Sequence, residues 1–355
     1  MKKYILSMVV AIVAILSSCS NDDITITTSY TFNVNASGVV KPFIEATDGE
    51  LEKFEDANDK VRIRLLIYNA NGELVAQESN YYSNYNTQLK ASKLLAAGNY
   101  TVIGISDVVV MSGNKVDIEF WKLSGESKLS EMKILDQNLI GLAGRILGIA
   151  KYSLTIGDNQ SSSLDVDLQP AGALVYSLVW KAGGWSYGGS KTTEWHLWGN
   201  KSTEGLSFDA FGNYIVMEEY DPETPGYIMG KIEAVEGDFH QFNYVLPMNN
   251  LYVHFVAITE GGYVDMADYS GREGTTLNIK AGEEYAFHLN MYERKTYYKK
   301  VTSKSDLQYP GSSSYSRTLS SPQKNLHVDK LAPMPKTLYN QTKHVLTAAE
   351  VEFSN

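Results

Sequence analysis

The sequence has 355 residues, of which 43% are hydrophobic and 11% aromatic, and its formal net charge is −10 at pH 7. Without the first 18 residues the chain is still long enough for two domains with substantial cores, or for three small ones. The acidic balance argues against nucleic acid as the main partner, because a nucleic-acid-binding surface needs an excess of Lys and Arg.

The first 18 residues have the pattern of a secretory signal peptide. Two lysines precede an apolar run over residues 4–16, which is shorter than the roughly 20 residues of a membrane-spanning helix. Two serines then precede Cys19, an arrangement that resembles the bacterial lipobox, where the thiol is acylated and becomes the first mature residue. We therefore predict lipidation at Cys19 and a membrane-tethered chain. The alternatives are an ordinary signal peptide and an uncleaved anchor.

Residues 19–28 are predicted to be a short acidic tether. Asp22 and Asp23 lie just after Cys19, which resembles the surface-export signal of Bacteroidetes lipoproteins. The expected location is therefore the outer membrane, with the chain exposed on the cell surface. Cys19 is the single cysteine, so no disulfide can form and the fold must depend on its hydrophobic core.

The next segments predict β-strands joined by turns. Residues 61–68 are largely apolar and are followed by Asn71-Gly72 and a second apolar run, which is typical of a β-hairpin. Residues 94–105 read as a turn that leads into a strand. Two segments, 51–60 and 127–142, are the best candidates for short helices.

A similar order of strand, glycine turn and strand returns over residues 251–287. This repeat predicts an all-β fold with two related β-domains, at 29–160 and 161–297, separated by the polar turn cluster at 157–163. Residues 298–355 are rich in Ser, Pro, Lys and Arg, and we expect them to form an irregular basic tail. Such a tail is either solvated or bound to the acidic body or to an anionic surface.

These segments together resemble the Bacteroidales fimbrillin superfamily, and within it the FimB/Mfa2-type fimbrial anchor and accessory lipoproteins. The residues that carry the resemblance are the lipobox, the acidic tether and the segments 67–75, 95–102 and 277–285. The resemblance implies two tandem transthyretin-like (Greek-key) β-sandwich domains. It also implies a structural and adhesive role, in which fimbrial subunits assemble by pairing β-strands.

The resemblance further distinguishes anchors from shaft subunits. Shaft subunits of the superfamily lose an N-terminal segment to a protease that cuts after arginine. Arg62 and Arg64 lie inside a predicted strand, which favours an unprocessed anchor or accessory subunit. Members often have an arginine where this chain has Gln169-Pro170, and this departure leaves the subfamily open.

A second function class follows from an aromatic segment between Trp180 and Trp198. Trp185, Tyr187, Trp195 and Trp198 lie among pairs of glycines, and aromatic rings on such loops can bind sugars. The segment thus predicts either contacts with glycans or another subunit, or rings that fill a core. A cell-surface glycan-binding lipoprotein is therefore the alternative function.

Other chemistry is weakly supported. The six histidines are scattered without the spacing of metal ligands, and no cofactor-binding motif is present. The acidic cluster at Glu218, Glu219 and Asp221 lacks the separation that glycoside hydrolysis requires, and there is no Gly-x-Ser-x-Gly turn. We therefore expect no enzymatic activity, no metal and no cofactor.

Overall fold

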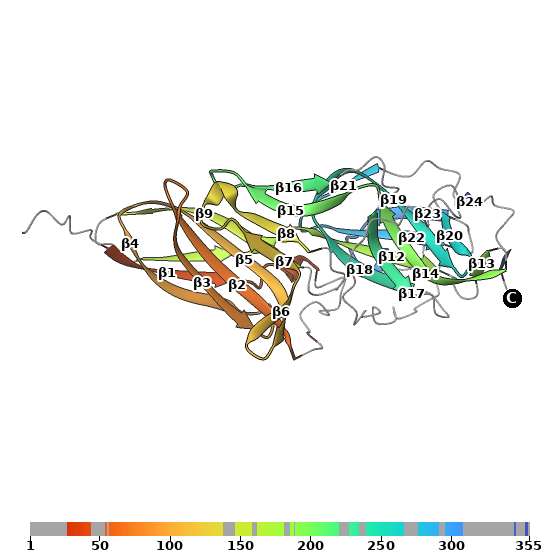
Figure 1. Cartoon of the computed structure of the whole chain (residues 1–355), viewed down its shortest axis with the longest axis horizontal. Helices are drawn as coiled ribbons and strands as arrows, with labels where there is room; N and C mark the ends of the chain where they lie inside the picture. The colour runs from red at the N-terminus through yellow and green to blue at the C-terminus, as the bar shows by residue number, and fades with distance from the viewer. Residues whose placement is uncertain are drawn as a thin grey trace, which may run out of the picture.

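The computed structural model describes most of the body of the chain. The described ranges are 27–43, 54, 57–137, 146–157, 162–180, 185–187, 189–219, 227–233, 239–265, 276–290, 295–307, 344–345 and 352–353. In these ranges every regular element is a β-strand or a short 3₁₀ turn, which confirms the all-β prediction. Figure 1 shows an elongated molecule with two β-rich lobes, one at each end of the long axis.

The N-terminal lobe contains two sheets. The smaller sheet has the order β10-β1-β4, with bounds Ser162–Asp167, Thr27–Asn35 and Gln88–Ala96. The larger sheet has the order β11-β9-β5-β2-β3, with β6 also paired to β5. Its bounds are Gln169–Pro170, Gly148–Ile156, Gly98–Ser112, Asp59–Asn69, Leu74–Tyr82 and, for β6, Lys115–Glu119. A 3₁₀ turn, η1, covers Lys41–Phe43.

The two sheets of this lobe pack face to face as a β-sandwich. Phe32 and Val34 of β1 share one buried core with Ile63 of β2 and Ile103 of β5. The hairpin between β2 and β3 is confirmed: Gly72 has φ 76°, and Asn69 Oδ1 accepts hydrogen bonds from two backbone amides of the turn. Only a residue that tolerates positive φ fits there.

The C-terminal lobe is a second pair of sheets. One has the order β18-β12-β22-β23, with bounds Phe239–Val245, Ala173–Trp180, Glu284–Asn290 and Lys295–Lys300. The other has the order β24-β20-β19-β14-β13-β25, with β17 on β14 and β21 on β19. Its bounds are His344–Val345, Gly262–Asp265, Met248–Thr259, Ser190–Gly199, Trp185–Tyr187, Glu352–Phe353, Tyr227–Glu233 and Thr276–Ile279. Val175, Leu197 and Phe255 belong to the core between these sheets.

A fifth sheet joins the two lobes. Its order is β16-β15-β8-β7, with bounds Tyr214–Glu219, Ser202–Phe208, Lys133–Asp136 and Trp121–Ser124. The hairpin β15–β16 follows β14 of the C-terminal lobe, yet β15 pairs with β8 of the N-terminal half of the chain, as Gly205↔Leu135 and Leu206↔Ile134. Figure 1 shows this hairpin lying along one side of the junction.

Side chains also couple the lobes. The Tyr244 hydroxyl of β18 donates a hydrogen bond to the Leu147 carbonyl over 2.8 Å and accepts one from the Gly172 amide. Lys151 Nζ of β9 donates to Asn213 Oδ1 in the β15–β16 turn over 2.7 Å. One buried core runs through both lobes, so the division into two independent domains stays a prediction.

Two expectations differ from the structure. The boundary expected at 160/161 falls inside the chain's course through the first lobe, because β10 pairs with β1 and β11 pairs with β9. The helix expected over 127–142 is, in its described part, a 3₁₀ turn, η3, at Leu129–Glu131 followed by β8, where strand pairing supplies the backbone hydrogen bonds. Most of the helix expected over 51–60 lies outside the described residues, and its last two residues belong to β2.

The beginning of the expected tail is also packed. β23 extends to Lys300, and a 3₁₀ turn, η6, follows at Lys304–Leu307. Val301 and Leu307 are buried in the main core. The Asp306 carboxylate holds the turn by accepting hydrogen bonds from the amide and hydroxyl of Thr302, both over 2.8 Å. Residues 298–307 are therefore part of the folded body and not of the expected irregular tail.

Candidate functional site

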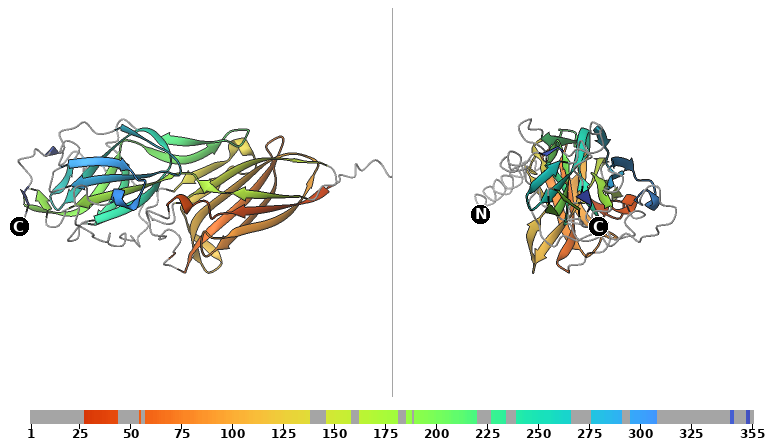
Figure 2. Two further views of the ribbon diagram at one scale, coloured as in Figure 1. Left: turned by 180° about the vertical axis from the view of Figure 1, so that it is seen from behind. Right: turned by 90° about the vertical axis from the view of Figure 1, so that its right-hand side faces the viewer.

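Strand β1 occupies a slot between β4 and β10 (Figure 2). It pairs antiparallel with β4 from Thr27↔Ala96 to Asn35↔Gln88 and parallel with β10 from Tyr30↔Ser162 to Asn35↔Asp167. A strand with partners on both sides leaves few backbone groups without a hydrogen bond. The first described strand of the chain is thus an internal strand of its sheet.

The sequence of β1 explains this position. Polar and apolar residues alternate over 29–35, so that one face can enter a core and the other can meet solvent. Tyr30, Phe32 and Val34 are buried, and the rings of Tyr30 and Phe32 lie 5.3 Å apart. Each buried large apolar side chain contributes about 2 kcal/mol, so β1 is strongly held.

Polar contacts reinforce the pairing of β1 with β10. Asn33 Nδ2 donates to Asp165 Oδ1 over 2.7 Å, and Asn35 Nδ2 donates to Asp167 Oδ1 over 3.4 Å. Thr31 and Ser92 share a hydrogen bond of 3.2 Å across the β1–β4 pair. The slot therefore selects an extended segment with alternating apolar and hydrogen-bonding side chains.

The connection from β1 to β2 contains no arginine. Residues 36–58 include Lys41 and Lys53 as their basic residues, and Arg62 is the first arginine of the whole sequence. An arginine-specific protease therefore has no site between β1 and the body of the sandwich. Its first two sites are Arg62 and Arg64, inside β2.

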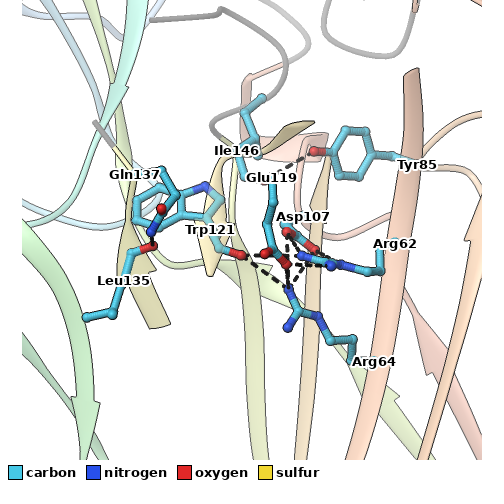
Figure 3. Close-up of polar contacts among 9 residues, drawn as sticks. All are labelled: Arg62, Arg64, Tyr85, Asp107, Glu119, Trp121, Leu135, Gln137 and Ile146. Carbon is cyan, nitrogen blue, oxygen red and sulfur yellow. Dashed lines mark hydrogen bonds and ion pairs between the residues drawn. The ribbon is translucent and has the colours of Figure 1, made fainter. Parts of the chain in front are cut away.

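Both arginines belong to a buried charge cluster (Figure 3). Arg62 binds both carboxylate oxygens of Asp107, with Nε–Oδ1 at 3.0 Å and Nη2–Oδ2 at 2.6 Å, and its Nη1 lies 2.6 Å from Glu119 Oε1. Arg64 Nη2 lies 3.3 Å from Asp107 Oδ2. Both guanidinium groups also donate to the Trp121 carbonyl over 3.3 Å.

The cluster is electrically balanced, with two cations and two anions. Burial disfavours the charge on Arg62, but the Asp107 carboxylate, followed by Glu119, outweighs this effect and raises the pKa of Arg62. The Asp107 side chain is fully buried, and the Arg62 side chain is 8% exposed. A protease cannot reach either arginine without separating β2 from β5, because Arg62↔Asp107 is a register pair of these strands.

Sequence reasoning missed Asp107 as a partner of the arginines. The available signal was a lone carboxylate within the apolar strand 102–110, since a buried charge requires an opposite charge. It also missed the slot of β1, although the alternation over 29–35 was visible. The alternation does not indicate which strands pair with β1, because its two partners are separated from it in the sequence by about 60 and 130 residues.

The structure describes the side chains of two of the four residues in the predicted aromatic site. Trp195 and Trp198 of β14 are buried, at 0% and 2% exposure, and Trp195 lies in the core of the C-terminal lobe. The Trp198 ring stacks on His196 with 6.4 Å between centroids. The side chains of Trp185 and Tyr187 in β13 lie outside the described part. The structure therefore brings Trp195 and Trp198 into packing rather than onto a sugar-binding surface.

The remaining predicted residues do not form a reactive site in the described ranges. Glu218 pairs with Lys201 over 2.8 Å, and Glu219 accepts a hydrogen bond from Ser202, so both are held in the β15–β16 hairpin. His254 and His288 lie on strands of different sheets, β19 and β22. Among the described residues, no group of three or more His, Cys, Asp or Glu side chains is placed to hold a metal ion.

The predicted lipid anchor lies outside the described residues. Cys19, the signal peptide over 1–18 and most of the acidic tether lie outside the described residues, and the last two tether residues belong to β1. None of the described elements is a helix with the length and apolar character needed to cross a membrane. Asp221 and His327 also lie outside the described residues, whereas His196, His240 and His344 lie in strands.

Neither a protein-family model nor a curated protein sequence matches the chain. Solved structures do match. The tip fimbrial protein Mfa3 of Porphyromonas gingivalis is 12% identical, with 78% of this chain and 98% of that chain covered and a TM-score of 0.39. A fimbrial assembly protein of Parabacteroides distasonis is 9% identical, with 77% and 99% covered and a TM-score of 0.37.

A third match is a candidate adhesin of Bacteroides thetaiotaomicron. It is 14% identical, 79% of this chain and 97% of that chain are covered, and the TM-score is 0.42. These values record a distant similarity and do not assign a function to the chain.

Proposed function

We propose that the chain is a fimbrial anchor or accessory subunit. It is tethered to the outer membrane at the cell surface through a lipid on Cys19, and it has a structural and adhesive role based on β-strand pairing with other subunits. The proposal includes no enzymatic activity and no cofactor. The sequence resemblance to the fimbrillin superfamily supports the class of protein. The position of β1 between β4 and β10 supports the role of an unprocessed anchor or accessory subunit.

The observation that carries the proposal is the pairing of β1 with both β4 and β10. A shaft subunit of that superfamily loses its N-terminal segment after an arginine and so leaves a place for a strand of another subunit. Here no arginine precedes β2, and Arg62 and Arg64 are buried in ion pairs with Asp107 and Glu119. The slot between β4 and β10 therefore remains filled by the chain's own strand, as expected of an unprocessed subunit.

Strand pairing with another subunit then requires a different edge. Within the described residues, β16 pairs with β15 alone, so its outer backbone groups are available to a further strand. Ile215 on β16 is 61% exposed, and Phe211 in the adjoining turn is 74% exposed. An edge strand with exposed apolar side chains is a site at which an extended segment can add to a sheet.

The first experiment isolates fimbrial material from the source bacterium and examines this chain by mass spectrometry. The expected result is an intact chain that begins with an acylated Cys19 and copurifies with other subunits. A strictly monomeric protein that is never found with fimbriae contradicts the proposal. A fimbria-associated chain that begins after Arg62 or Arg64 contradicts the anchor role in particular.

The second experiment tests the β16 edge. Ile215→Lys places a charge on the exposed edge and should lower the amount of chain recovered in fimbriae while the isolated protein stays folded. Leu94→Lys is the matched control, because Leu94 is 70% exposed on the edge strand β4. Equal losses in the two variants would exclude β16 as the specific contact.

For the alternative function, a glycan-binding lipoprotein, two of the four candidate contact residues are no longer available. Trp195 and Trp198 are buried, which leaves Trp185 and Tyr187 as its candidates. Affinity electrophoresis in gels that contain host or plant polysaccharides tests it. Retardation that is abolished by Trp185→Ala or Tyr187→Ala would support glycan binding, and migration unaffected by any polysaccharide would remove it.

A further inference from the structure

The parallel pairing of β1 with β10 has a mechanical meaning. β1 enters the lobe from the N-terminal segment, and β10 leaves toward the C-terminal lobe through β11 and β12. We propose that the β1–β10 pair is a mechanical clamp that carries tension between the N-terminal tether and the C-terminal lobe. The inference rests on the proposed function for the source of the load, and on the structure for the clamp itself.

The geometry places the two points of load at opposite ends of neighbouring strands. β1 begins at the outer end of the N-terminal lobe and runs toward the junction (Figures 1 and 2). β10 is parallel to it, in register from Tyr30↔Ser162 to Asn35↔Asp167. A pull on the segment before Thr27 and a pull on the chain after Asp167 therefore act along the two strands in opposite directions.

This arrangement loads the hydrogen bonds in shear. When two paired strands are pulled lengthwise in opposite directions, all the bonds between them share the force and must break together. When the strands are pulled apart from the same end, the bonds break one after another, each under the full force. Since the net strength of one such bond is small, sharing the load is what allows a strand pair to resist tension.

Side chains oppose sliding in the same direction. Asn33–Asp165 and Asn35–Asp167 are hydrogen bonds between the two strands, at 2.7 and 3.4 Å, and both lose their geometry if β1 slips by one residue. A one-residue slip would also turn Phe32 and Val34 away from the core, because side chains alternate between the faces of a strand. On its other side, β1 is held by its full-length pairing with β4.

Hydrogen bonds also hold the segment that follows β10. The Leu168 amide donates to the Asn35 carbonyl over 3.0 Å, directly at the end of β1. The Ala171 amide donates to the Leu147 carbonyl over 2.8 Å, and the Gly172 amide donates to the Tyr244 hydroxyl of the C-terminal lobe. Load that leaves β10 therefore passes into a bonded junction.

The experiment stretches single molecules of the mature chain, residues 19–355, made without the lipid. Cys19 is the single cysteine, so its thiol carries one handle. The second handle is attached to Gln169→Cys, in β11 two residues beyond the far end of β10, or to Ala97→Cys, beside the pair Thr27↔Ala96; both positions are exposed. The first pair of handles shears β1, and the second peels it away from β4.

The expected result is a rupture force several times higher with the Gln169 handle than with the Ala97 handle at the same pulling speed. Equal forces in the two geometries, or a lower force with the Gln169 handle, would overturn the clamp. The measurement uses neither lipid nor partner. A failure of the clamp therefore leaves the anchor proposal standing, and a soluble protein never found with fimbriae would leave a measured clamp intact.

A matched pair of variants locates the resistance. Asn33→Ala removes the exposed bond to Asp165 in the β1–β10 pair. Thr155→Ala removes the exposed bond of 2.8 Å from Thr155 to Asn99 in the β9–β5 pair, which is off the load path. At constant force with the Gln169 handle, Asn33→Ala should shorten the lifetime about fivefold, and Thr155→Ala should leave it unchanged. Equal effects, or no effect of Asn33→Ala, would contradict the assignment.

Discussion

Asn33 Nδ2 lies 2.7 Å from Asp165 Oδ1, although the two residues are 132 positions apart in the sequence. This contact joins β1 to a parallel strand that the chain reaches after forming every other strand of the N-terminal lobe except β11. Its chemistry is directional, because the amide donates and the carboxylate accepts. Exchanging the two groups therefore provides a clean test of the contact.

The first prediction concerns this exchange. Asn33→Asp places a second carboxylate opposite Asp165 and should lower the free energy of unfolding by about 1 kcal/mol. The double variant Asn33→Asp with Asp165→Asn restores one donor and one acceptor, and it should recover most of the loss. Urea unfolding of the four proteins gives the coupling energy. A double variant that is no more stable than the sum of its single changes would contradict a direct contact.

The second prediction concerns the buried charge cluster. Asp107→Asn leaves Arg62 and Arg64 without their shared carboxylate and should lower the free energy of unfolding by about 3–5 kcal/mol. The native variant should also become sensitive to an arginine-specific protease, with cleavage after residues 62 or 64. Urea unfolding and mapping of the fragments provide the two measurements.

The control for this cluster is an ion pair on the surface. Glu78→Gln breaks the Lys93–Glu78 pair of 2.6 Å, in which the Glu78 side chain is 43% exposed, and should cost less than about 1 kcal/mol. Glu119→Gln provides a milder change within the cluster if Asp107→Asn does not fold. An Asp107→Asn protein as stable and as protease-resistant as the wild type would refute the shielding of the arginines.

The third prediction concerns pH. His288 is 1% exposed, and burial lowers its pKa to about 4, although a hydrogen bond with the backbone of Asp306 opposes the shift. The unfolded chain has a histidine pKa near 6.5, so between these values it binds more protons than the folded chain. Stability is therefore fully present above pH 6.5 and falls as the pH decreases toward 4, by on the order of 3 kcal/mol.

Denaturant unfolding at several pH values measures this loss. His288→Gln should remove most of the pH dependence between 6.5 and 4, whatever its effect at neutral pH. Asp306 does not interfere in this range, because hydrogen bonds to Lys299 and Thr302 hold its pKa below the ordinary value and its contribution is lost at lower pH. An unchanged slope in His288→Gln would show that other groups cause the acid sensitivity.

The fourth prediction concerns the junction of the lobes. Tyr244→Phe removes the hydroxyl that joins the Leu147 carbonyl to the Gly172 amide and leaves both without this partner. The expected loss is about 1–3 kcal/mol, with a separation of the thermal transitions of the two lobes in calorimetry. Tyr81→Phe is the control, because the Tyr81 ring is 40% exposed on β3. A single transition unchanged by Tyr244→Phe would show that the Tyr244 hydroxyl does not contribute to the coupling of the lobes.

Local patterns predicted the strands well, because alternation and turn residues act over a few positions. The Asn71-Gly72 turn and the strands on either side of it appear as expected. The sheet at the junction was not predictable in this way. Leu135 pairs with Gly205, and nothing in the sequence near β8 indicates a partner 70 residues away.

Burial was equally hard to assign to the aromatic residues. Trp195 and Trp198 lie in a strand that is apolar on both faces, and such a run is compatible with a core or with an exposed platform. In the structure both side chains are buried. Cys19 is a different case: its chemistry follows from a short linear motif that needs no fold, and its lipidation stays a prediction.

The β15–β16 hairpin has a consequence for biosynthesis. Its residues emerge from the ribosome after those of the N-terminal lobe, yet β8 receives its neighbour from β15. A polypeptide ending near residue 170 would therefore present β8 with one bare edge, and it would lack the Lys151–Asn213 contact. During synthesis, the sheet that contains β8 therefore cannot be completed until the β15–β16 hairpin, which ends at Glu219, is available to pair with it.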